Sequence, residues 1–122
     1  MPQDNRINTQ SEVDIKLNEI ITTALLDTGA RHTVISEKLA QKLKTPIDKT
    51  KTRTLRTAAI GGRMNTIGTI HHLKAIIEKE QYPIKINNVS VIKELDKQLI
   101  IERTEIINNG LIIDLKRNKI MT

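Results

Sequence analysis

Hydrophobic and polar residues alternate along much of this chain, in the period-two pattern of half-buried strands. The clearest case is Val13 to Leu17, where every second residue is apolar. The run Ile20 to Leu26 is mostly apolar and predicts a second, more buried strand. Asn18-Glu19 lies between the two runs, so we expect a two-residue turn there and an antiparallel hairpin.

The same pattern recurs along the rest of the chain. It predicts strands at Thr52 to Ile60, Met64 to Ile70 with a continuation through Leu73 to Ile77, Pro83 to Ile92, Leu99 to Ile101 and Leu111 to Ile120. Gly61-Gly62 separates the first two of these strands and is a hairpin signal. Asn87-Asn88 offers a possible turn inside the segment 83–92.

Two short segments carry helix signals instead. Ser36 can cap a helix over Glu37 to Lys44, and Pro46 stops it. One face of that helix is apolar and consists of Leu39, Ala40 and Leu43. Thr104 to Asn109 is long enough for one helical turn, which Gly110 ends as a left-handed cap. The predicted fold class is therefore all-β with one or two short helices.

Composition agrees with this plan and limits the chemistry. The chain has 122 residues, enough for one domain, which we place at 12–122 behind a flexible polar arm at 1–11. Its 21 isoleucines and 14 threonines favour strands. Cysteine is absent, which excludes disulfides, thiol catalysis and cysteine-ligated zinc. No apolar stretch is long enough for a membrane helix, and no signal peptide opens the chain, which indicates a cytosolic start or a piece of something larger.

The net charge of +6 is concentrated in residues 42–56, where six lysines and arginines face one acid, Asp48. This segment is either a surface for nucleic acid or a solvated helix end and loop. We favour the second interpretation because nucleic-acid platforms use stacking aromatics, and Tyr82 is the only aromatic. Histidine suggests no metal site either, because His71 and His72 are adjacent and would point to opposite faces of a strand.

The most informative motif is Asp27-Thr28-Gly29, which follows the apolar run 20–26 directly. A carboxylate between core strands is costly to bury unless something keeps it there. Aspartic proteolysis needs such an arrangement, because two facing carboxylates share one proton and activate a water. The chain has no second Asp-Thr/Ser-Gly, and Asp114 is followed by Leu115-Lys116 rather than by a turn. A second copy of the chain must then supply the other carboxylate, through a two-fold axis.

Three segments in order resemble the retropepsins, the aspartic proteases of retroviruses and long-terminal-repeat retrotransposons. The first is Asp14 to Ser36, in which a hairpin leads into Ala-Leu-Leu-Asp-Thr-Gly-Ala. The second is Ile60-Gly61-Gly62, which is similar to the tip of the family's flap. The third is Leu99-Ile100-Ile101-Glu102-Arg103-Thr104, in the place of the family's apolar-apolar-Gly-Arg-Asp/Asn segment. The resemblance implies a closed β-barrel-type protease half that acts as a homodimer.

The resemblance also implies roles for individual residues. Asp27, Thr28 and Gly29 are the expected catalytic turn, with Thr28 holding the two copies together. Substrate binding is expected from Leu25, Ala30, Arg31, His32, Val34, Ile60, Gly61, Gly62 and Ile100, of which Ile60, Gly61 and Gly62 form the flap tip. Arg103 is the expected structural residue near the site. No cofactor or metal is implied, and the expected partner is a peptide or polyprotein of Gag-Pol type, in the cytoplasm or a virus-like particle.

The chain departs from the family at four positions. Glu102 stands where the family usually has Gly, and Thr104 where it has Asp or Asn. Arg31 and His32 replace acids that pair with the later arginine in many retroviral members, so Arg31 would face Arg103, and Glu102 is the nearest source of negative charge. Two alternatives therefore remain: an inactive dimeric binding module on the same fold, and a small basic β-domain that binds nucleic acid through 42–56.

Overall fold

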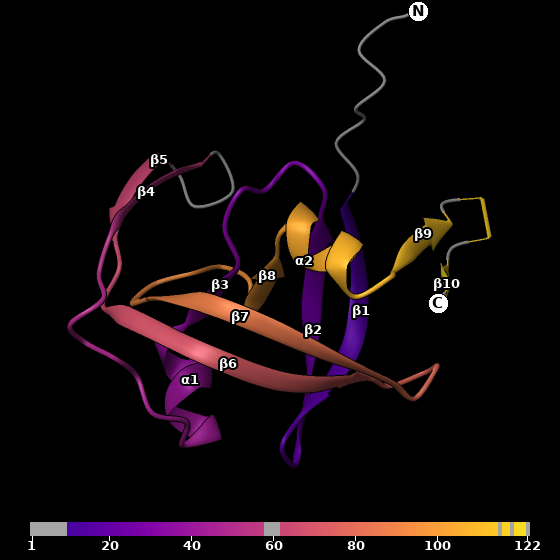
Figure 1. Cartoon of the computed structure of the whole chain (residues 1–122), viewed down its shortest axis with the longest axis horizontal. Coiled ribbons are helices and arrows are strands. Elements are labelled where there is room, and N and C mark those ends of the chain that lie inside the picture. The colour runs from indigo at the N-terminus through magenta and orange to yellow at the C-terminus, as the bar shows by residue number, and fades with distance from the viewer. Residues whose placement is uncertain (1–9, 58–61, 115, 118, 122) are drawn as a thin grey trace, which may run out of the picture.

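Six strands close into a barrel in the computed structural model, which describes residues 10–57, 62–114, 116–117 and 119–121. The strands are β1 (Gln10–Leu17), β2 (Ile20–Asp27), β3 (Val34–Ser36), β6 (Gly68–Ile77), β7 (Tyr82–Ile92) and β8 (Leu99–Ile101). Their order is β1-β2-β8-β3-β7-β6, and β1 pairs with β6 to close the barrel (Figure 1). Closure leaves no open sheet edge among the six.

Two small sheets and two helices are attached to the barrel. They are the hairpin of β4 (Thr54–Thr57) and β5 (Gly62–Asn65), the hairpin of β9 (Ile112–Asp114) and β10 (Lys119–Met121), α1 (Glu37–Leu43) and α2 (Arg103–Asn108). Figure 1 shows the two hairpins on opposite sides of the barrel. The predicted fold class, all-β with short helices, is confirmed. Neither helix of the described chain is long and apolar enough to cross a membrane.

The first hairpin forms as the alternation predicts. Leu17 pairs with Ile20, and Asn18 adopts the positive φ of 54° that the tight turn needs. The strand begins earlier than expected, because Gln10 already pairs with Asp27. Residues 10 and 11 of the expected arm are therefore part of β1, and residues 1–9 lie outside the described chain.

The first helix also follows its sequence signals. The Ser36 hydroxyl accepts the backbone N–H of Leu39 at 3.1 Å, which confirms the N-cap. The helix ends at Leu43, and Lys44 follows it with a left-handed backbone as the C-cap. Its buried residues are Leu39, Ala40 and Leu43, as predicted.

The strand predicted at 64–70 with its continuation to 77 is wrong as one element. The chain changes partner near Thr66, whose N–H donates to the Arg53 carbonyl, while the next N–H, from Ile67, donates to Val91. Residues before this point pair with β4 and residues after it join the barrel. Gly68, just after this change, allows the close approach of residues 47 and 48, because a Cβ there would lie 2.7 Å from the Ile47 side chain.

The turn predicted at Asn87-Asn88 does not form, and β7 runs through it. Its ladder with β6 keeps one register from Gly68 to Ile77. Asn88 still has a left-handed backbone, with φ of 54°, inside the strand. Asn87 is held by two neighbours: its N–H donates to Glu105 Oε1 at 3.1 Å, and its Oδ1 lies 2.9 Å from His72 Nδ1. Pairing along the barrel therefore overrides the local turn preference.

The single strand predicted at 111–120 is a hairpin instead. Asp114 ends β9, and its Oδ1 accepts the N–H of Arg117 at 3.1 Å, an interaction typical of a turn. Ile113 and Ile120 are paired and face the barrel core. Ile112 and Met121 are the next pair, and they are exposed. The C-terminal hairpin, residues 112–121, thus has one buried and one exposed apolar face.

Strand β2 separates two apolar clusters because its side chains alternate. Ala24 and Leu26 belong to the main barrel core, whereas Leu25 points to the other side. The second apolar cluster contains Leu25, Val34, Leu55, Ile92 and Ile100, with Ala30, Met64 and Leu95 packed against it. By the same alternation, Asp27 lies on the side of Leu25, toward this cluster.

The loop that leads into the β4–β5 hairpin is tied to the barrel through Asp48. Its backbone exchanges two hydrogen bonds with Thr69 of β6, at 2.8 and 3.0 Å. Its carboxylate contacts His71 Nε2 at 2.7 Å and accepts the N–H and hydroxyl of Thr50. The Thr50 hydroxyl bond and, next, the His71 bond lower the pKa of Asp48 from 3.8 to about 2.

Asp48→Asn is expected to make the free energy of unfolding depend less on pH in the acidic range. A carboxylate with a lowered folded-state pKa stabilises the fold above its ordinary pKa, and this stabilisation is lost as the pH falls through the folded-state value. Urea unfolding from pH 6 to pH 2 measures it: the wild-type midpoint should fall between about pH 4 and pH 2 by more than that of Asp48→Asn. Asp96→Asn, at an exposed aspartate, is the control, and parallel profiles for wild type and Asp48→Asn contradict the role.

Candidate active site

Asp27 ends β2 and is held in a short turn at one end of the barrel. Its side chain is buried, with 5% exposed, and its Oδ1 accepts the N–H of Gly29 at 2.9 Å. The N–H of Ala30 donates to the Asp27 carbonyl at 3.1 Å. β2 is paired on both sides, with β1 and β8, so the strand that carries the carboxylate is rigidly placed. A buried carboxylate on a rigid strand suits acid–base chemistry.

The second apolar cluster lies beside this turn, between the barrel strands on one side and the β4–β5 hairpin on the other. Leu25, Val34 and Ile100, three of the predicted pocket residues, come together in it. Sequence reasoning missed Leu55 and Met64, which pair with each other in the β4–β5 hairpin. Each is an isolated apolar residue between polar neighbours, so the alternation about Gly61-Gly62 was a signal that could have found them. The hairpin therefore packs over the cluster with the Leu55–Met64 face.

The loop after Asp27 is fixed by a reciprocal pair of hydrogen bonds. The N–H of Thr33 donates to Glu102 Oε2 at 3.1 Å, and the N–H of Glu102 donates to Thr33 Oγ1 at 3.1 Å. Thr33 is 1% exposed, and its carbonyl accepts the N–H of Ser90 at 2.9 Å. Glu102 thus joins the loop 28–33 to the start of α2. Glu102, which stands where the family usually has Gly, therefore fixes the backbone of this loop through its carboxylate.

Arg31 and Arg103 do not form the ion pair that an acid at position 31 would allow. Both side chains are exposed, and His32, which follows Arg31 in the same loop, is half-buried. The backbone N–H of Arg103 makes a long contact of 3.5 Å to the carbonyl of Ala30. Arg103 therefore reaches the loop through its backbone.

Glu102→Ala is expected to lower the free energy of unfolding by about 1–3 kcal/mol, because it leaves the buried N–H of Thr33 without its acceptor. Glu102→Gln keeps a carbonyl oxygen at the same reach and should cost much less. Chemical denaturation measures both. The control is Glu94→Ala, which makes the same substitution at an exposed glutamate in the loop before β8. It should change the free energy of unfolding by no more than about 0.5 kcal/mol. Equal stability of Glu102→Ala and wild type contradicts the assignment.

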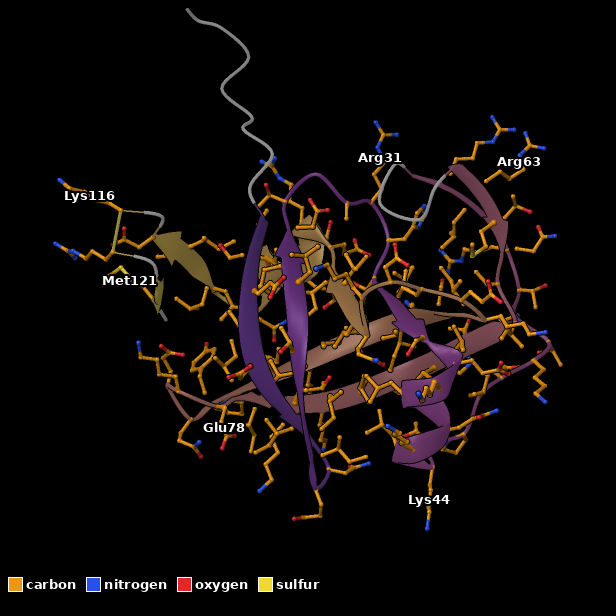
Figure 2. All side chains as sticks on the ribbon, turned by 180° about the vertical axis from the view of Figure 1, so that it is seen from behind. Arg31, Lys44, Arg63, Glu78, Lys116 and Met121 are labelled. Carbon is orange, nitrogen blue, oxygen red and sulfur yellow. The ribbon has the colours of Figure 1, made fainter. Side chains whose placement is uncertain are left out.

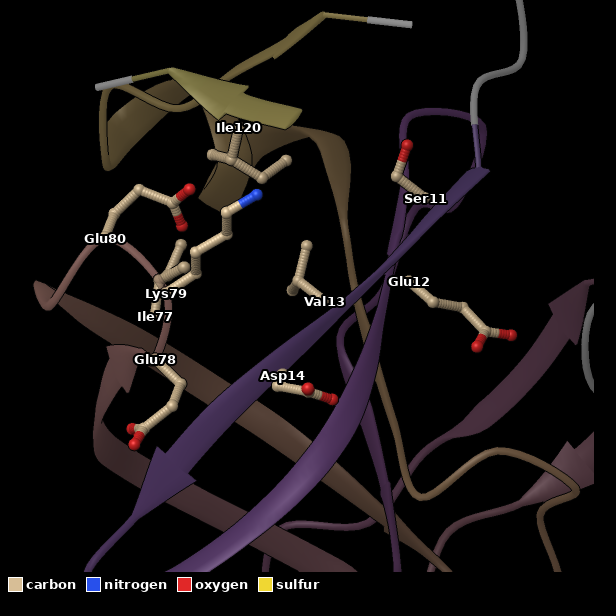
Figure 3. Close-up of a pocket in the computed structure, with 9 residues that line it drawn as sticks. All are labelled: Ser11, Glu12, Val13, Asp14, Ile77, Glu78, Lys79, Glu80 and Ile120. Atoms are coloured by element: carbon tan, nitrogen blue, oxygen red, sulfur yellow. The ribbon is translucent and has the colours of Figure 1, made fainter. Parts of the chain in front are cut away.

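Two pockets of the described chain lie away from Asp27. The first, of about 410 Å³, is bounded by β1, the β6–β7 turn and β10 (Figure 3). The second, of about 740 Å³, is bounded by residues of β1, β6, β7 and α2. Asp27 lines neither. The part of the chain that the structure describes also holds no group of three or more His, Asp or Glu side chains placed to bind a metal ion.

Of the three residues predicted to form the flap tip, the structure describes only Gly62. Gly62 begins β5, pairs with Thr57, and has a φ of +111°, a conformation that favours glycine. Ile60 and Gly61 lie outside the described residues. The predicted hairpin itself is present, because β4 and β5 pair antiparallel through four residues each.

Comparisons with known proteins agree on the fold. A sequence model of the gag-polyprotein putative aspartyl protease family matches residues 13–101. Among solved structures, the retroviral protease-like domain of Ddi1 from Leishmania major superposes with a TM-score of 0.71 at 24% identity, over 93% of this chain and 87% of that one. A search of curated proteins found no match. The structural likeness establishes a retropepsin-like fold.

Proposed function

This chain belongs to the gag-polyprotein putative aspartyl protease family, and we propose that it is an aspartic endopeptidase that acts as a homodimer. The observation that carries the proposal is the buried Asp27, held by the Gly29 N–H at 2.9 Å at the end of a doubly paired strand. Its substrate would be a polyprotein of Gag-Pol type, cleaved in the cytoplasm or in a virus-like particle. That biological role rests on the family.

The proposed mechanism pairs Asp27 with the Asp27 of a second copy. Two carboxylates at hydrogen-bonding distance titrate as a pair and share one proton, so one acts as base and the other as acid. The base takes a proton from water, which attacks the peptide carbonyl carbon. The acid protonates the leaving amine, and the dyad regains its starting state. This shared proton is the established mechanism of aspartic proteases as a class.

The second carboxylate is expected from another copy because Asp114 is poorly suited to the role. It lies in the C-terminal hairpin, where its Oδ2 is 3.8 Å from Arg117 and its Oδ1 accepts a backbone N–H. Asp27 also lines neither of the two pockets described above for the single chain. A groove shared between two copies accounts for both observations.

The dimer surface is proposed at the C-terminal hairpin and α2. Ile112 and Met121 pair across the hairpin and are 59% and 38% exposed, while Ile107 of α2 is 60% exposed. Exposed apolar groups in one place mark interaction sites. A second copy is the occupant that fits, since the catalytic chemistry requires one and α2 begins beside the Asp27 loop at Arg103.

Substrate is proposed to lie extended between the β4–β5 hairpin and the Asp27 turn. Leu25, Val34, Leu55 and Ile100 are buried against one another in the single chain. A peptide side chain would contact them when the hairpin lifts, and closure would then exclude water. Thr28 is proposed to join the two copies beside the dyad, while Ala30, Arg31 and His32 lie along the floor.

Cleavage of a mixed pool of extended peptides at mildly acidic pH tests the proposal. Wild type should cleave and Asp27→Asn should not. Activity should fall at alkaline pH, because a dyad that has lost its shared proton has no acid. A dimeric wild type that cleaves nothing at high protein concentration would instead support the inactive binding module.

A further inference from the structure

Four exposed arginines lie at the end of the molecule that carries Asp27. Arg31 follows the catalytic turn, Arg103 begins α2, and Arg56 and Arg63 are on the β4–β5 hairpin. We call these four residues the basic rim. Figure 2 shows the Arg31 and Arg63 side chains at the same end of the molecule, opposite Lys44.

The second apolar cluster brings the basic rim together. Ala30, Leu55 and Met64 pack in this cluster, and they are the sequence neighbours of Arg31, Arg56 and Arg63, respectively. Since adjacent residues of a strand point to opposite faces, burial of Leu55 and Met64 places Arg56 and Arg63 on the outer face of the hairpin. The contact from the Arg103 N–H to the Ala30 carbonyl brings the fourth arginine to the loop.

The charges of the basic rim are not held in ion pairs with acids of the described chain. Arg56 and Arg63 are directly opposite each other in the hairpin, a like-charge pair that costs stability. The ion pairs that the structure gives for the described residues are His71–Asp48, Lys97–Glu12 and Arg117–Asp114, and no rim arginine takes part. Three acids besides Asp27 lie in this region. The Oε2 of Glu102 is taken by the Thr33 N–H. Glu94 and Asp96, which flank Leu95 of the same cluster, are exposed and form no ion pair with a rim arginine. An acidic partner would relieve this repulsion.

We propose that the basic rim selects acidic peptides, so that preferred substrates carry Asp or Glu on either side of an apolar cleavage point. The proposal rests on the peptidase function above. Arg31, on the exposed loop next to the catalytic turn, makes the direct contact. Arg56 and Arg63 act through their field, because a charged rim raises the local concentration and association rate of an oppositely charged substrate.

A peptide fits this surface better than a nucleic acid. The arginines flank an apolar cluster, and a nucleic acid would place a charged phosphate at every nucleotide across it, whereas a peptide can keep its charges to its flanks. Single-stranded nucleic acids bind stacking aromatics, whereas the only aromatic of the chain is Tyr82, whose hydroxyl donates to the Asn109 carbonyl at 2.9 Å. An apolar peptide core with acidic flanks complements both parts of the surface.

Two peptides that differ only in their flanks test the proposal. Both have the same apolar centre, and the flanking residues are Glu in one and Gln in the other. For wild type at low salt, kcat/KM should be about tenfold higher for the Glu peptide. The difference should shrink at high salt, because salt screens exposed charges. Arg31→Gln should lower the preference mainly through KM, and Lys44→Gln, at the far end of the molecule, should leave it unchanged.

A binding measurement separates this proposal from the peptidase function. Fluorescence anisotropy with the Asp27→Asn variant reports Glu-peptide and Gln-peptide affinity without cleavage. Tighter binding of the Glu peptide that is reduced by Arg31→Gln supports the basic rim, even if wild type cleaves no peptide. Absence of cleavage by wild type would count only against the peptidase function. Equal binding and equal kcat/KM for the two peptides overturn the proposal. Salt-dependent binding of single-stranded RNA, with no preference for the Glu peptide, overturns it in favour of a nucleic-acid surface.

Discussion

Asp27→Asn is expected to lower peptide cleavage by about 10²–10⁴-fold or more, the range over which a positioned acid or base contributes to catalysis. In a symmetric dimer the substitution removes both carboxylates at once, so the upper part of this range applies. The asparagine amide can neither take the proton of the attacking water nor return it to the leaving amine. Initial rates on the cleaved member of the peptide pool measure the effect.

The control for Asp27→Asn must separate chemistry from folding. The variant should remain folded and dimeric, because Asn is nearly the same size as Asp and its Oδ1 can still accept the Gly29 N–H. Asp96→Asn makes the same change at an exposed position and should cleave at the wild-type rate. Cleavage by Asp27→Asn near the wild-type rate contradicts the aspartic dyad and leaves the catalytic group to be found elsewhere.

Ile112→Glu is expected to produce the second large effect, loss of the dimer. A buried apolar anchor contributes about 2 kcal/mol or more to an interface, which is roughly a thirtyfold change in affinity. A two-fold interface contains the residue twice, so the two losses act together. A charged Glu adds a desolvation cost. Analytical ultracentrifugation should show monomer where wild type is dimer, and activity should fall in parallel.

The matched control is Ile21→Glu. Ile21 is 57% exposed, close to the 59% of Ile112, but it lies on β2 opposite Lys16, away from the C-terminal hairpin. Its substitution should leave the dimer intact. Activity of Ile112→Glu should recover at high protein concentration, because mass action restores the dimer. If Ile21→Glu dissociates the dimer and Ile112→Glu does not, the interface lies on the barrel wall.

Predictions from the sequence were most accurate where neighbouring residues decide the conformation. The turn at Asn18-Glu19, the Ser36 cap and the left-handed Gly110 all occur as predicted. Each depends on hydrogen bonds or backbone angles within a few residues. The predictions failed at Asn87-Asn88 and at Met64 to Ile70, where pairing with distant strands chooses between local alternatives.

The candidate site divides in the same way. The Asp27-Thr28-Gly29 turn could be found in the sequence because three adjacent residues carry its chemistry. The contact between Thr33 and Glu102 joins residues 69 positions apart, and the sequence offered no signal for it. Leu55 and Met64 were missed because their role depends on the packing of the hairpin over β2 and β8.

By itself, the sequence determined a β-rich chain with short capped helices, one buried carboxylate at the end of a strand, and a family resemblance. These properties follow from side-chain alternation, capping groups and short motifs, which act over a few residues. Only the tertiary structure decided the strand order of the barrel, the C-terminal hairpin with its exposed Ile112–Met121 pair, and the apolar cluster that brings the neighbours of the rim arginines together. Those features depend on which distant segments bury each other's apolar surface, and the gain from that burial outweighs local preference.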